Sequence, residues 1–195
     1  MKVKKIILAT KNLNKVKEFK EIFSEYDYEV LSLLDLSYPF LIDENGDSFS
    51  SNSYIKAKAI YDYYKLPVIA DDSGLSVDAL DGLPGIYSHR FSGRSASDID
   101  NTHKVISMLK DMGLTESNAH FTCAITYMDS EKTITKEGYI YGKVILAPKG
   151  SNGFGYDPIF YLDEYKKTLA ELPESIKNKI SHRYNALLKL KEVLK

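Results

Sequence analysis

Two adjacent carboxylates, Asp71 and Asp72, follow an apolar run and precede Ser73 and Gly74. Neighbouring strand residues point to opposite faces of a sheet, so both carboxylates converge only if the chain turns, and Ser73-Gly74 is expected to supply that turn. Converging carboxylates repel each other, which leaves one protonated or lets a cation neutralise the pair, and oxygen ligands select a hard ion such as Mg²⁺. Taken alone, the segment is equally well a capping Asp and a turn Asp.

A second polar segment, from Thr10 to Lys15, lies where a strand is expected to give way to a helix. Unpaired N–H groups and the helix dipole at such a start attract an anion, and Thr10 and Asn12 can donate hydrogen bonds to phosphate oxygens. Lys15, about one turn into the helix, adds a mobile positive charge. Polar residues at a helix start are also ordinary caps, so both interpretations stay open.

A glycine-rich segment at 150–158 places Phe154 and Tyr156 on either side of Gly155, and Asp157 follows. Glycine lets the backbone approach a ligand closely, and the two rings offer flat surfaces for a base. The carboxylate of Asp157 can accept a hydrogen bond from an N–H of a purine. The alternative is a tight hairpin that packs on its own aromatic rings.

The fourth segment combines Lys177 with Ser181-His182-Arg183, near the expected start of the last helix, which Ser181 can cap. Arg183 can donate two hydrogen bonds to a base carbonyl or to a phosphate. His182 is not expected to activate a nucleophile, because the single thiol, Cys123, lies in an expected strand and no Gly-x-Ser-x-Gly motif occurs. A surface arginine beside a helix cap is the alternative interpretation.

The patterning of the first half predicts the elements that carry these segments. The runs at 6–9 and 66–70 are short, continuous and apolar, which is typical of strands buried on both faces. A helix is expected after the first run, with Lys15 and Glu18 on its polar face, and a second one from the Ser50–Ser53 cluster onward.

The second half changes from helical to strand periodicity. A helix is expected from Ser97-Asp98 to Gly113, and apolar residues alternate from Phe121 to Tyr127 as in a half-buried strand. Further strands at 133–141 and 143–147 and a leucine-rich last helix complete the pattern. Strand–helix units followed by a β-meander indicate an α/β fold with a mixed sheet.

The composition excludes several classes of protein. The 195 residues, 44% of them hydrophobic, suit one domain over 1–195, and a net charge of -1 gives no general attraction to nucleic acid. One cysteine and four scattered histidines exclude an intramolecular disulfide and a zinc site built on cysteines or on His-x3-His spacing. No apolar stretch is long enough for a signal peptide or a membrane span, so we expect a soluble, cytoplasmic protein without a membrane partner.

Taken in the order of the sequence, the segments resemble the Ham1 family, also called the inosine triphosphate pyrophosphatase family, over nearly the whole chain. The family's signature segments are similar to Thr-Gly-Asn-x-x-Lys, Asp-Asp-Ser-Gly-Leu, Phe-Gly-Tyr-Asp-Pro and Ser-His-Arg. This chain has corresponding segments in the same order. The resemblance implies a Ham1/Maf-like single domain, with a central mixed, curved sheet flanked by helices and an active-site cleft between two lobes. It also implies a homodimer.

The activity that the resemblance implies is Mg²⁺-dependent hydrolysis of non-canonical purine nucleoside triphosphates, namely ITP, dITP and XTP, to the monophosphate and pyrophosphate. Asp72 would be the general base, Lys56 a further phosphate contact, and Asp43, Asp71 and Asp72 the metal ligands. The implied substrate contacts are Thr10, Lys11, Asn12, Leu13, Asn14, Lys15, Ser73, Phe154, Gly155, Tyr156, Asp157, Lys177, His182 and Arg183.

Three positions depart from the family pattern. Lys11 stands where a glycine is usual, so either the backbone there needs no positive φ or the phosphate loop has another shape. Asp43 stands where a metal-binding Glu is usual, and Glu44 beside it can substitute. Ser51 stands where a Glu is common, which leaves the metal ligands less defined than the fold.

The implied mechanism is attack of a water on the α-phosphorus, with Asp72 positioning or deprotonating it. Donors at Arg183 and on the backbone would select a 6-keto purine over adenine, whereas the exclusion of guanine has no explanation in the sequence. Two other functions remain: a nucleotide-binding sensor without turnover, and a binder of single-stranded nucleic acid that stacks bases on Phe154 and Tyr156. The near-neutral charge argues against the second.

Overall fold

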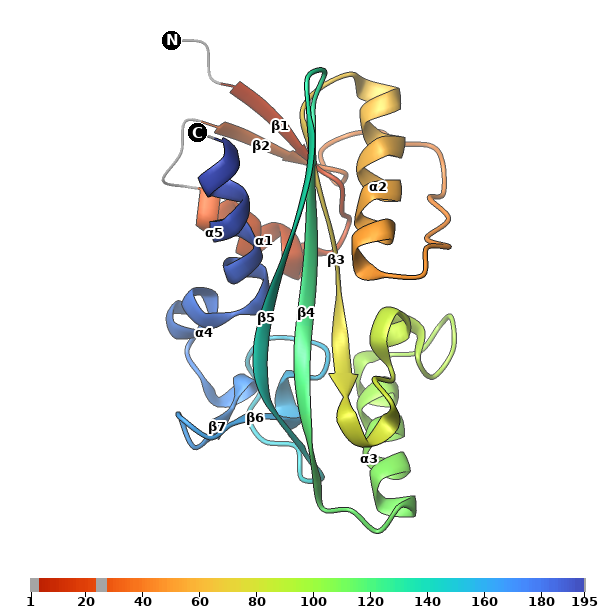
Figure 1. The fold of residues 1–195 in the computed structure, drawn as a ribbon, viewed down its shortest axis with the longest axis vertical. Coiled ribbons are helices and arrows are strands. Elements are labelled where there is room, and N and C mark those ends of the chain that lie inside the picture. The colour runs from red at the N-terminus through yellow and green to blue at the C-terminus, as the bar shows by residue number, and fades with distance from the viewer. Residues whose placement is uncertain (1–3, 24–27, 195) are drawn as a thin grey trace. The chain divides into compact units, whose positions relative to one another are not determined.

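The structure is a computed structural model that describes residues 4–23 and 28–194, with the side chains at 4, 22, 193 and 194 left out (Figure 1). It divides into two compact units, which are described separately. Unit 1 comprises residues 1–72, 123–138 and 183–195, and unit 2 comprises 73–122 and 139–182.

Seven strands of the described chain form one sheet in the order β2-β1-β3-β4-β5-β6-β7. Their bounds are Lys4–Leu8 (β1), Tyr28–Ser32 (β2), Val68–Val77 (β3), Glu116–Met128 (β4), Thr133–Ile145 (β5), Phe160–Leu162 (β6) and Lys167–Thr168 (β7). β1 pairs in parallel with β2 and β3, whereas β5, β6 and β7 pair antiparallel. The prediction of an α/β fold with a mixed sheet is therefore confirmed.

The helices of the described residues are α1 (Leu13–Phe23), α2 (Phe49–Tyr64), α3 (Asp98–Asp111), α4 (Glu174–Ile180) and α5 (His182–Leu194). Short 3-10 helices lie at η1 (Asp78–Leu80), η2 (Gly85–Arg90), η3 (Asp157–Ile159) and η4 (Leu169–Glu171). None of these helices is both long and apolar enough to cross a membrane.

Local sequence explains where α2 and α3 begin. Ser48 and Ser97 are the N-caps, and each side chain accepts a hydrogen bond from the backbone N–H three residues later, while Ser51 and Asp100 bind back to the cap. This reciprocal capping satisfies N–H groups that a helix start leaves unpaired. After α3, Gly113 adopts a φ of +72°, as expected of the residue that ends a helix.

Unit 1 has a helical layer on each face of its strands, and side-chain alternation decides which residues meet which layer. Ile6, Leu8 and Ile69 pack with α1 and α5, whereas Ile7 and Val68 pack with α2. Figure 1 shows α1 and α5 on one side of β1 and α2 on the other. Adjacent residues of β1 and β3 in this unit therefore lie in two different cores.

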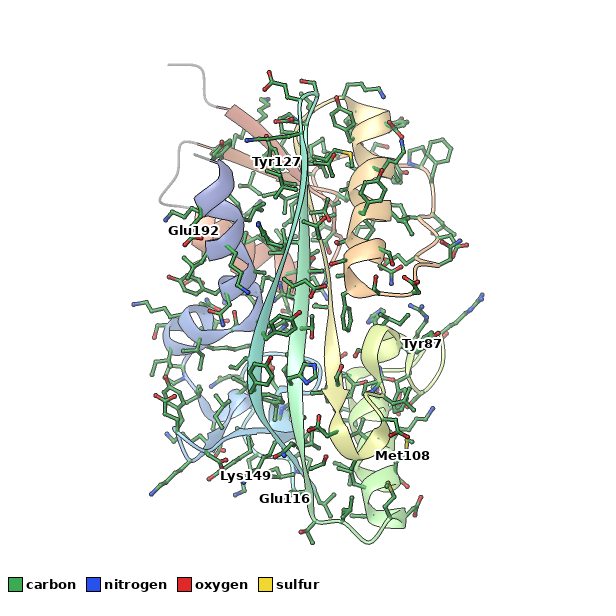
Figure 2. All side chains as sticks on the ribbon, viewed as in Figure 1. Tyr87, Met108, Glu116, Tyr127, Lys149 and Glu192 are labelled. Carbon is green, nitrogen blue, oxygen red and sulfur yellow. The ribbon has the colours of Figure 1, made fainter. Side chains whose placement is uncertain are left out.

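Unit 2 has a single core between its strand segments and α3. Leu75 and Val77 of β3 pack with Val105 and Leu109 of α3 and with Phe160 of β6. Met108 of α3, labelled in Figure 2, borders this core and is partly buried. The core fixes β3 immediately after the two carboxylates.

Two predictions about the strands were wrong. β4 is buried from residue 121 to 128, not half-buried, because its two faces are covered: Cys123 and Ile125 pack with α1 and α5, and Met128 packs with α2. The strands predicted at 133–141 and 143–147 form the single β5. Gly142 does not interrupt it: a Cβ there would meet the carbonyl oxygen of Tyr161 at 2.5 Å, so glycine allows β6 to approach.

The packing of α1 predicts a large stability loss for Phe19→Ala. Phe19 is fully buried between α1, α5 and the strands of unit 1, so truncation leaves a cavity and should lower the free energy of unfolding by about 3–5 kcal/mol. Leu41→Ala is the control, because Leu41 is 99% exposed and its loss should change that free energy by less than about 0.5 kcal/mol. Urea unfolding measures both, and equal losses would contradict the packing.

Candidate active site

The two central carboxylates lie on opposite faces of β3. The strand continues from Val68 to Val77 through the Asp-Asp-Ser-Gly segment, so the predicted turn at Ser73-Gly74 is wrong. Gly74 is buried inside the strand, and Ser73 is partly buried. By the alternation of the strand, Asp71 shares the face of α1 and α5, and Asp72 shares the face of α2.

Asp71 is the anion of a buried charge group on the α1 and α5 face. Its Oδ2 accepts from Lys15 Nζ at 2.9 Å and from Nε and Nη2 of Arg183 at 3.4 Å each. Arg183 Nη1 also donates to Glu18. Burial raises the pKa of Asp71, but the charges of Lys15 and Arg183 outweigh it and hold the pKa below its usual value.

Lys15 and Glu18 were expected on the exposed, polar face of α1. Both side chains are mostly buried and bind the Asp71–Arg183 pair instead. The prediction failed because helical periodicity identifies which residues share a face and does not show a buried charge on the neighbouring strand. The i, i+3 spacing of Lys15 and Glu18 places them side by side on the helix. This spacing was the one sign in the sequence that the two side chains could share a partner.

Asp72 belongs to a second charge group, on the α2 face. Lys56 Nζ donates to Glu44 at 2.8 Å and to Asp72 Oδ1 at 3.4 Å. Burial raises the pKa of Asp72, Glu44 raises it further, and the opposing effects of Lys56, Lys15 and a hydrogen bond from Asn52 are smaller. A carboxylate with a raised pKa accepts a proton more readily than an ordinary aspartate does, as a general base requires.

Lys56 remains a cation in this setting. Burial lowers its pKa, but the charges of Asp72 and Glu44 more than compensate, so the pKa is raised. Asn52 connects the same group to the loop before α2, because its Oδ1 accepts from the Gly46 N–H at 2.9 Å. Sequence reasoning missed Asn52.

The segment at 10–15 forms a capped helix start at the end of β1. Asn12 Oδ1 accepts from the N–H groups of Asn14 and Lys15, and Thr10 Oγ1 accepts from the Asn12 N–H. Lys11 is exposed and has no positive φ, so a residue other than glycine fits there without backbone strain. Leu13 and Asn14 are exposed in the first turn of α1.

Unit 2 contains a third charge group, around Asp157. Its Oδ2 accepts from Lys177 Nζ at 2.5 Å and from the Phe154 N–H at 2.9 Å, and both charged side chains are about 5% exposed. Lys177 Nζ also lies 5.0 Å from the centre of the Phe154 ring. Lys177, Asp157 and Phe154 are therefore brought together, as the resemblance implied.

Two predicted base contacts are parts of the unit 2 core. Tyr156 is 4% exposed, and its hydroxyl donates to the Ser88 carbonyl at 2.8 Å, so its ring is not an open stacking surface. His182 is buried and stacks on Phe121 with ring centroids 4.9 Å apart. The Gly155 N–H donates to Asp98 Oδ2 at 2.8 Å, which fixes the backbone between Phe154 and Tyr156.

The predicted metal ligands do not form one cluster. Asp71 and Asp72 are on opposite faces of β3, Asp43 is exposed, and no group of three His, Cys, Asp or Glu side chains in residues 4–23 and 28–194 is arranged to hold an ion. Two buried oxygens, Asp71 Oδ1 and Asp72 Oδ2, have no hydrogen-bond partner within those ranges. On the α2 face, Asp72 and Glu44 share Lys56, and hard carboxylate oxygens of this kind suit Mg²⁺.

Comparison with known proteins assigns the family. The sequence model of the Ham1 family matches residues 6–193. The chain belongs to the Ham1 family. Among Ham1 structures, it superposes on the Staphylococcus aureus Ham1 protein with a TM-score of 0.87 at 39% identity, and on a HAM1 protein from Coxiella burnetii with 0.89 at 36%, covering 98% of both chains in each case.

Curated Ham1 relatives are similarly close in sequence. A Halalkalibacterium halodurans protein named dITP/XTP pyrophosphatase is 47% identical over 191 residues, which cover 96% of this chain and 97% of the relative. A Bacillus subtilis protein with the same name is 45% identical and covers 98% of both chains. The family model, at residues 6–193, spans all four signature segments.

Because Gly153 lies against the Asp157 group, we expect glycine to be required at position 153. Gly153 has a φ of +80°, and a Cβ there would collide with Asp157 Oδ2 and lie 2.7 Å from Lys177 Nζ. Gly82 has a nearly identical φ of +82° with nothing within 4 Å, so it is a matched control. Gly82→Ala should cost about 1–2 kcal/mol from backbone strain alone.

Gly153→Ala should cost a further 1–3 kcal/mol or so, because the methyl group displaces the Lys177–Asp157 pair. Urea unfolding measures the difference between the two variants. Equal losses in the two variants would show that the ion pair tolerates a side chain at 153.

Proposed function

We propose that this Ham1 family chain is an enzyme that hydrolyses non-canonical purine nucleoside triphosphates, with dITP, XTP and ITP as substrates, to the monophosphate and pyrophosphate. The observation that carries the proposal is Asp72, a mostly buried carboxylate that Lys56 holds in place and whose pKa is raised. The names of the curated relatives, dITP/XTP pyrophosphatase, agree with this chemistry.

In this reaction the Asp72 carboxylate takes a proton from water, and Oδ2 is the oxygen that has no partner among the described residues. A bond forms between the water oxygen and the α-phosphorus. The bond from the α-phosphorus to the oxygen bridging the β-phosphate breaks, and pyrophosphate leaves with the bonding electrons. Lys56 stays protonated beside Asp72 and balances the charge of the phosphates.

Phosphate binding is assigned to the helix start at 10–15. The positive end of the α1 dipole attracts an anion, and the side chains of Lys11 and Lys15 are the cations nearest to it in sequence. Thr10 and Asn12 already brace this backbone by accepting from it, so they hold the loop in shape as well as offering donors.

The proposal includes Mg²⁺ as the cofactor. Glu44 and Asp72 are the residues that would hold it, since both reach the α2 face, whereas Asp43 is exposed. When bound, the ion neutralises negative charge on the phosphates and makes the α-phosphorus easier to attack.

Selection of the base is assigned to the Asp157 group of unit 2. The Lys177 ammonium carries donors only, and Asp157 fixes its position. A 6-keto purine offers an acceptor to such a donor, whereas the 6-amino group of adenine places a donor against a donor, which is unfavourable. The Phe154 ring next to Lys177 gives the base an apolar surface.

The proton-acceptor role of Asp72 is tested by Asp72→Asn. The amide cannot take a proton, so kcat for dITP should fall by about 10²- to 10⁴-fold, with a smaller change in KM. Asp78→Asn is the control, because Asp78 is exposed on η1, six residues along the chain.

The assay measures pyrophosphate and deoxyinosine monophosphate released in the presence of Mg²⁺. Binding of dITP without turnover by the unsubstituted protein would instead indicate a sensor. Release of orthophosphate would contradict attack at the α-phosphorus.

The dependence of the rate on Mg²⁺ tests whether Glu44 or Asp43 is the metal ligand. Chelation of the metal should abolish pyrophosphate release, and Glu44→Gln should raise the Mg²⁺ concentration needed for half-maximal rate by about 10- to 100-fold, in the range found when a group supporting a metal is lost. Asp43→Asn, the neighbouring control, should leave that concentration unchanged because its side chain is exposed. The reverse pattern would assign the ion to Asp43.

A further inference from the structure

Three consecutive peptide groups around Phe154 are held by side-chain hydrogen bonds within unit 2. The Phe154 N–H donates to Asp157 Oδ2 at 2.9 Å, and the Gly155 N–H donates to Asp98 Oδ2 at 2.8 Å. The Gly155 carbonyl accepts from Thr102 Oγ1 at 3.4 Å. The peptide groups on both sides of the Phe154 Cα are therefore anchored, one to Asp157 and the other to Asp98.

Asp98 and Thr102 reach Gly155 from one face of α3. Asp98 is the first residue of this helix, and Thr102 follows it by four positions, a spacing that stacks two side chains on the same face. Thr102 is buried, whereas Asp98 is exposed. The start of α3 thus clamps both polar groups of a single glycine that lies far along the chain.

Gly155 is the point at which the segment deforms most easily. Its φ is +62°, and a Cβ built there would have nothing within 4 Å, so close packing does not restrict this residue. Glycine has more conformational freedom than any other residue. Its bound N–H and bound carbonyl restrict that freedom, and they fix the direction in which the backbone leaves Phe154.

The Phe154 ring needs a fixed position because it works together with a fixed cation. Its centre lies 5.0 Å from Lys177 Nζ, and Asp157 holds that ammonium. A base bound to this group contacts the ring and the ammonium at the same time. Such a site binds well only when its supporting residues hold every contact group close to its productive place.

We propose that Asp98, with Thr102, is a positioning residue for base binding, which anchors the Phe154–Gly155 peptide and thereby holds the Phe154 ring against the purine. This inference rests on the proposed function for the identity of the ligand. Asp98 acts through Gly155 and not by contact with the base. It belongs to none of the four signature segments, so the sequence gave no sign of this role.

The test compares a ligand that has the base with one that lacks it, in calorimetry with the full-length protein. Deoxyinosine monophosphate carries the base and has no anhydride bond to hydrolyse, whereas inorganic tripolyphosphate carries only phosphates. Asp98→Ala removes the acceptor of the Gly155 N–H and should weaken deoxyinosine monophosphate binding by about five- to tenfold, while tripolyphosphate affinity stays within about twofold.

The kinetic readout follows from the same contact. A lost positioning contact on the base removes binding that the ground state and the transition state share. In Asp98→Ala, KM for dITP should therefore rise by about five- to tenfold and kcat should change by less than about twofold. Equal loss of affinity for deoxyinosine monophosphate and for tripolyphosphate would overturn the proposal.

Asp98→Asn tests whether the acceptor oxygen is what matters. Asparagine keeps a carbonyl oxygen in the same place, so deoxyinosine monophosphate affinity should stay within about threefold of the unsubstituted protein. An Asn variant as impaired as the Ala variant would assign the effect to the negative charge at the helix start and overturn the proposal.

Asp100→Ala is the matched control, two residues along the same turn of α3. Asp100 Oδ2 accepts from the N–H and the hydroxyl of the cap residue Ser97, so its loss should weaken the helix start and lower stability to urea. It should nevertheless leave deoxyinosine monophosphate affinity within about twofold. An equal fall in this affinity in Asp100→Ala and Asp98→Ala would show that helix stability alone is responsible.

Thr102→Val decides the matter if Asp98→Ala fails to fold by circular dichroism. Valine has nearly the shape of threonine and lacks the hydroxyl that donates to Gly155, so deoxyinosine monophosphate should bind about threefold more weakly. Unchanged affinity for deoxyinosine monophosphate in the folded variant would overturn the proposal.

The same measurements separate this inference from the proposed function. If the unsubstituted protein binds deoxyinosine monophosphate but releases no pyrophosphate from dITP, the enzymatic proposal fails, and selective weakening in Asp98→Ala would still support the positioning role. If dITP is hydrolysed and Asp98→Ala behaves as the unsubstituted protein does, only the positioning role fails.

Discussion

Successive side chains of a β-strand point to opposite faces, and in β3 this constraint separates two carboxylates that are neighbours in sequence. Asp71 enters the core that α1 and α5 cover, and Asp72 enters the side that α2 covers. Each face then requires its own cations: Lys15 and Arg183 on one, Lys56 on the other. The chemistry assigned to this segment depends on that separation.

The two environments tune the carboxylates in opposite directions. Burial penalises the charged form of both, but two close cations hold the pKa of Asp71 low, whereas the neighbouring charge of Glu44 helps to keep the pKa of Asp72 raised. Asp71 is thereby a permanent anion suited to holding cations. Asp72 is the carboxylate suited to accepting a proton, and a single strand supplies both without a turn or loop.

The sequence predicted the general fold because apolar periodicity and capping residues are local signals. Ser97 and Gly113 delimit α3 as expected, and the apolar run at 66–70 overlaps the start of β3, which begins at Val68 and continues through both carboxylates. The continuation of β3 after Asp72 was not predictable, because Ser73-Gly74 has the composition of a turn and its strand pairing depends on segments far away in the sequence. The expected homodimer and cytoplasmic location stay predictions, because neither follows from the packing of one chain.

Side-chain partners from distant segments were the least predictable part of the site. Arg183 has the donors that a contact to a base carbonyl needs, and in this structure those donors meet Asp71 and Glu18. Tyr156 likewise has the ring that a stacking surface needs, but its hydroxyl binds the Ser88 carbonyl inside the core. The residue type determines which hydrogen bonds a side chain can donate, but its acceptor depends on which distant segments the fold brings near it.

The separation of the two carboxylates is tested most directly by a crystal structure with Mn²⁺ in place of Mg²⁺ and a non-hydrolysable analogue of dITP. We predict an anomalous peak beside Asp72 and Glu44, and Lys15 Nζ on a phosphate oxygen. A peak beside Asp71 on the opposite face of β3 would contradict the account.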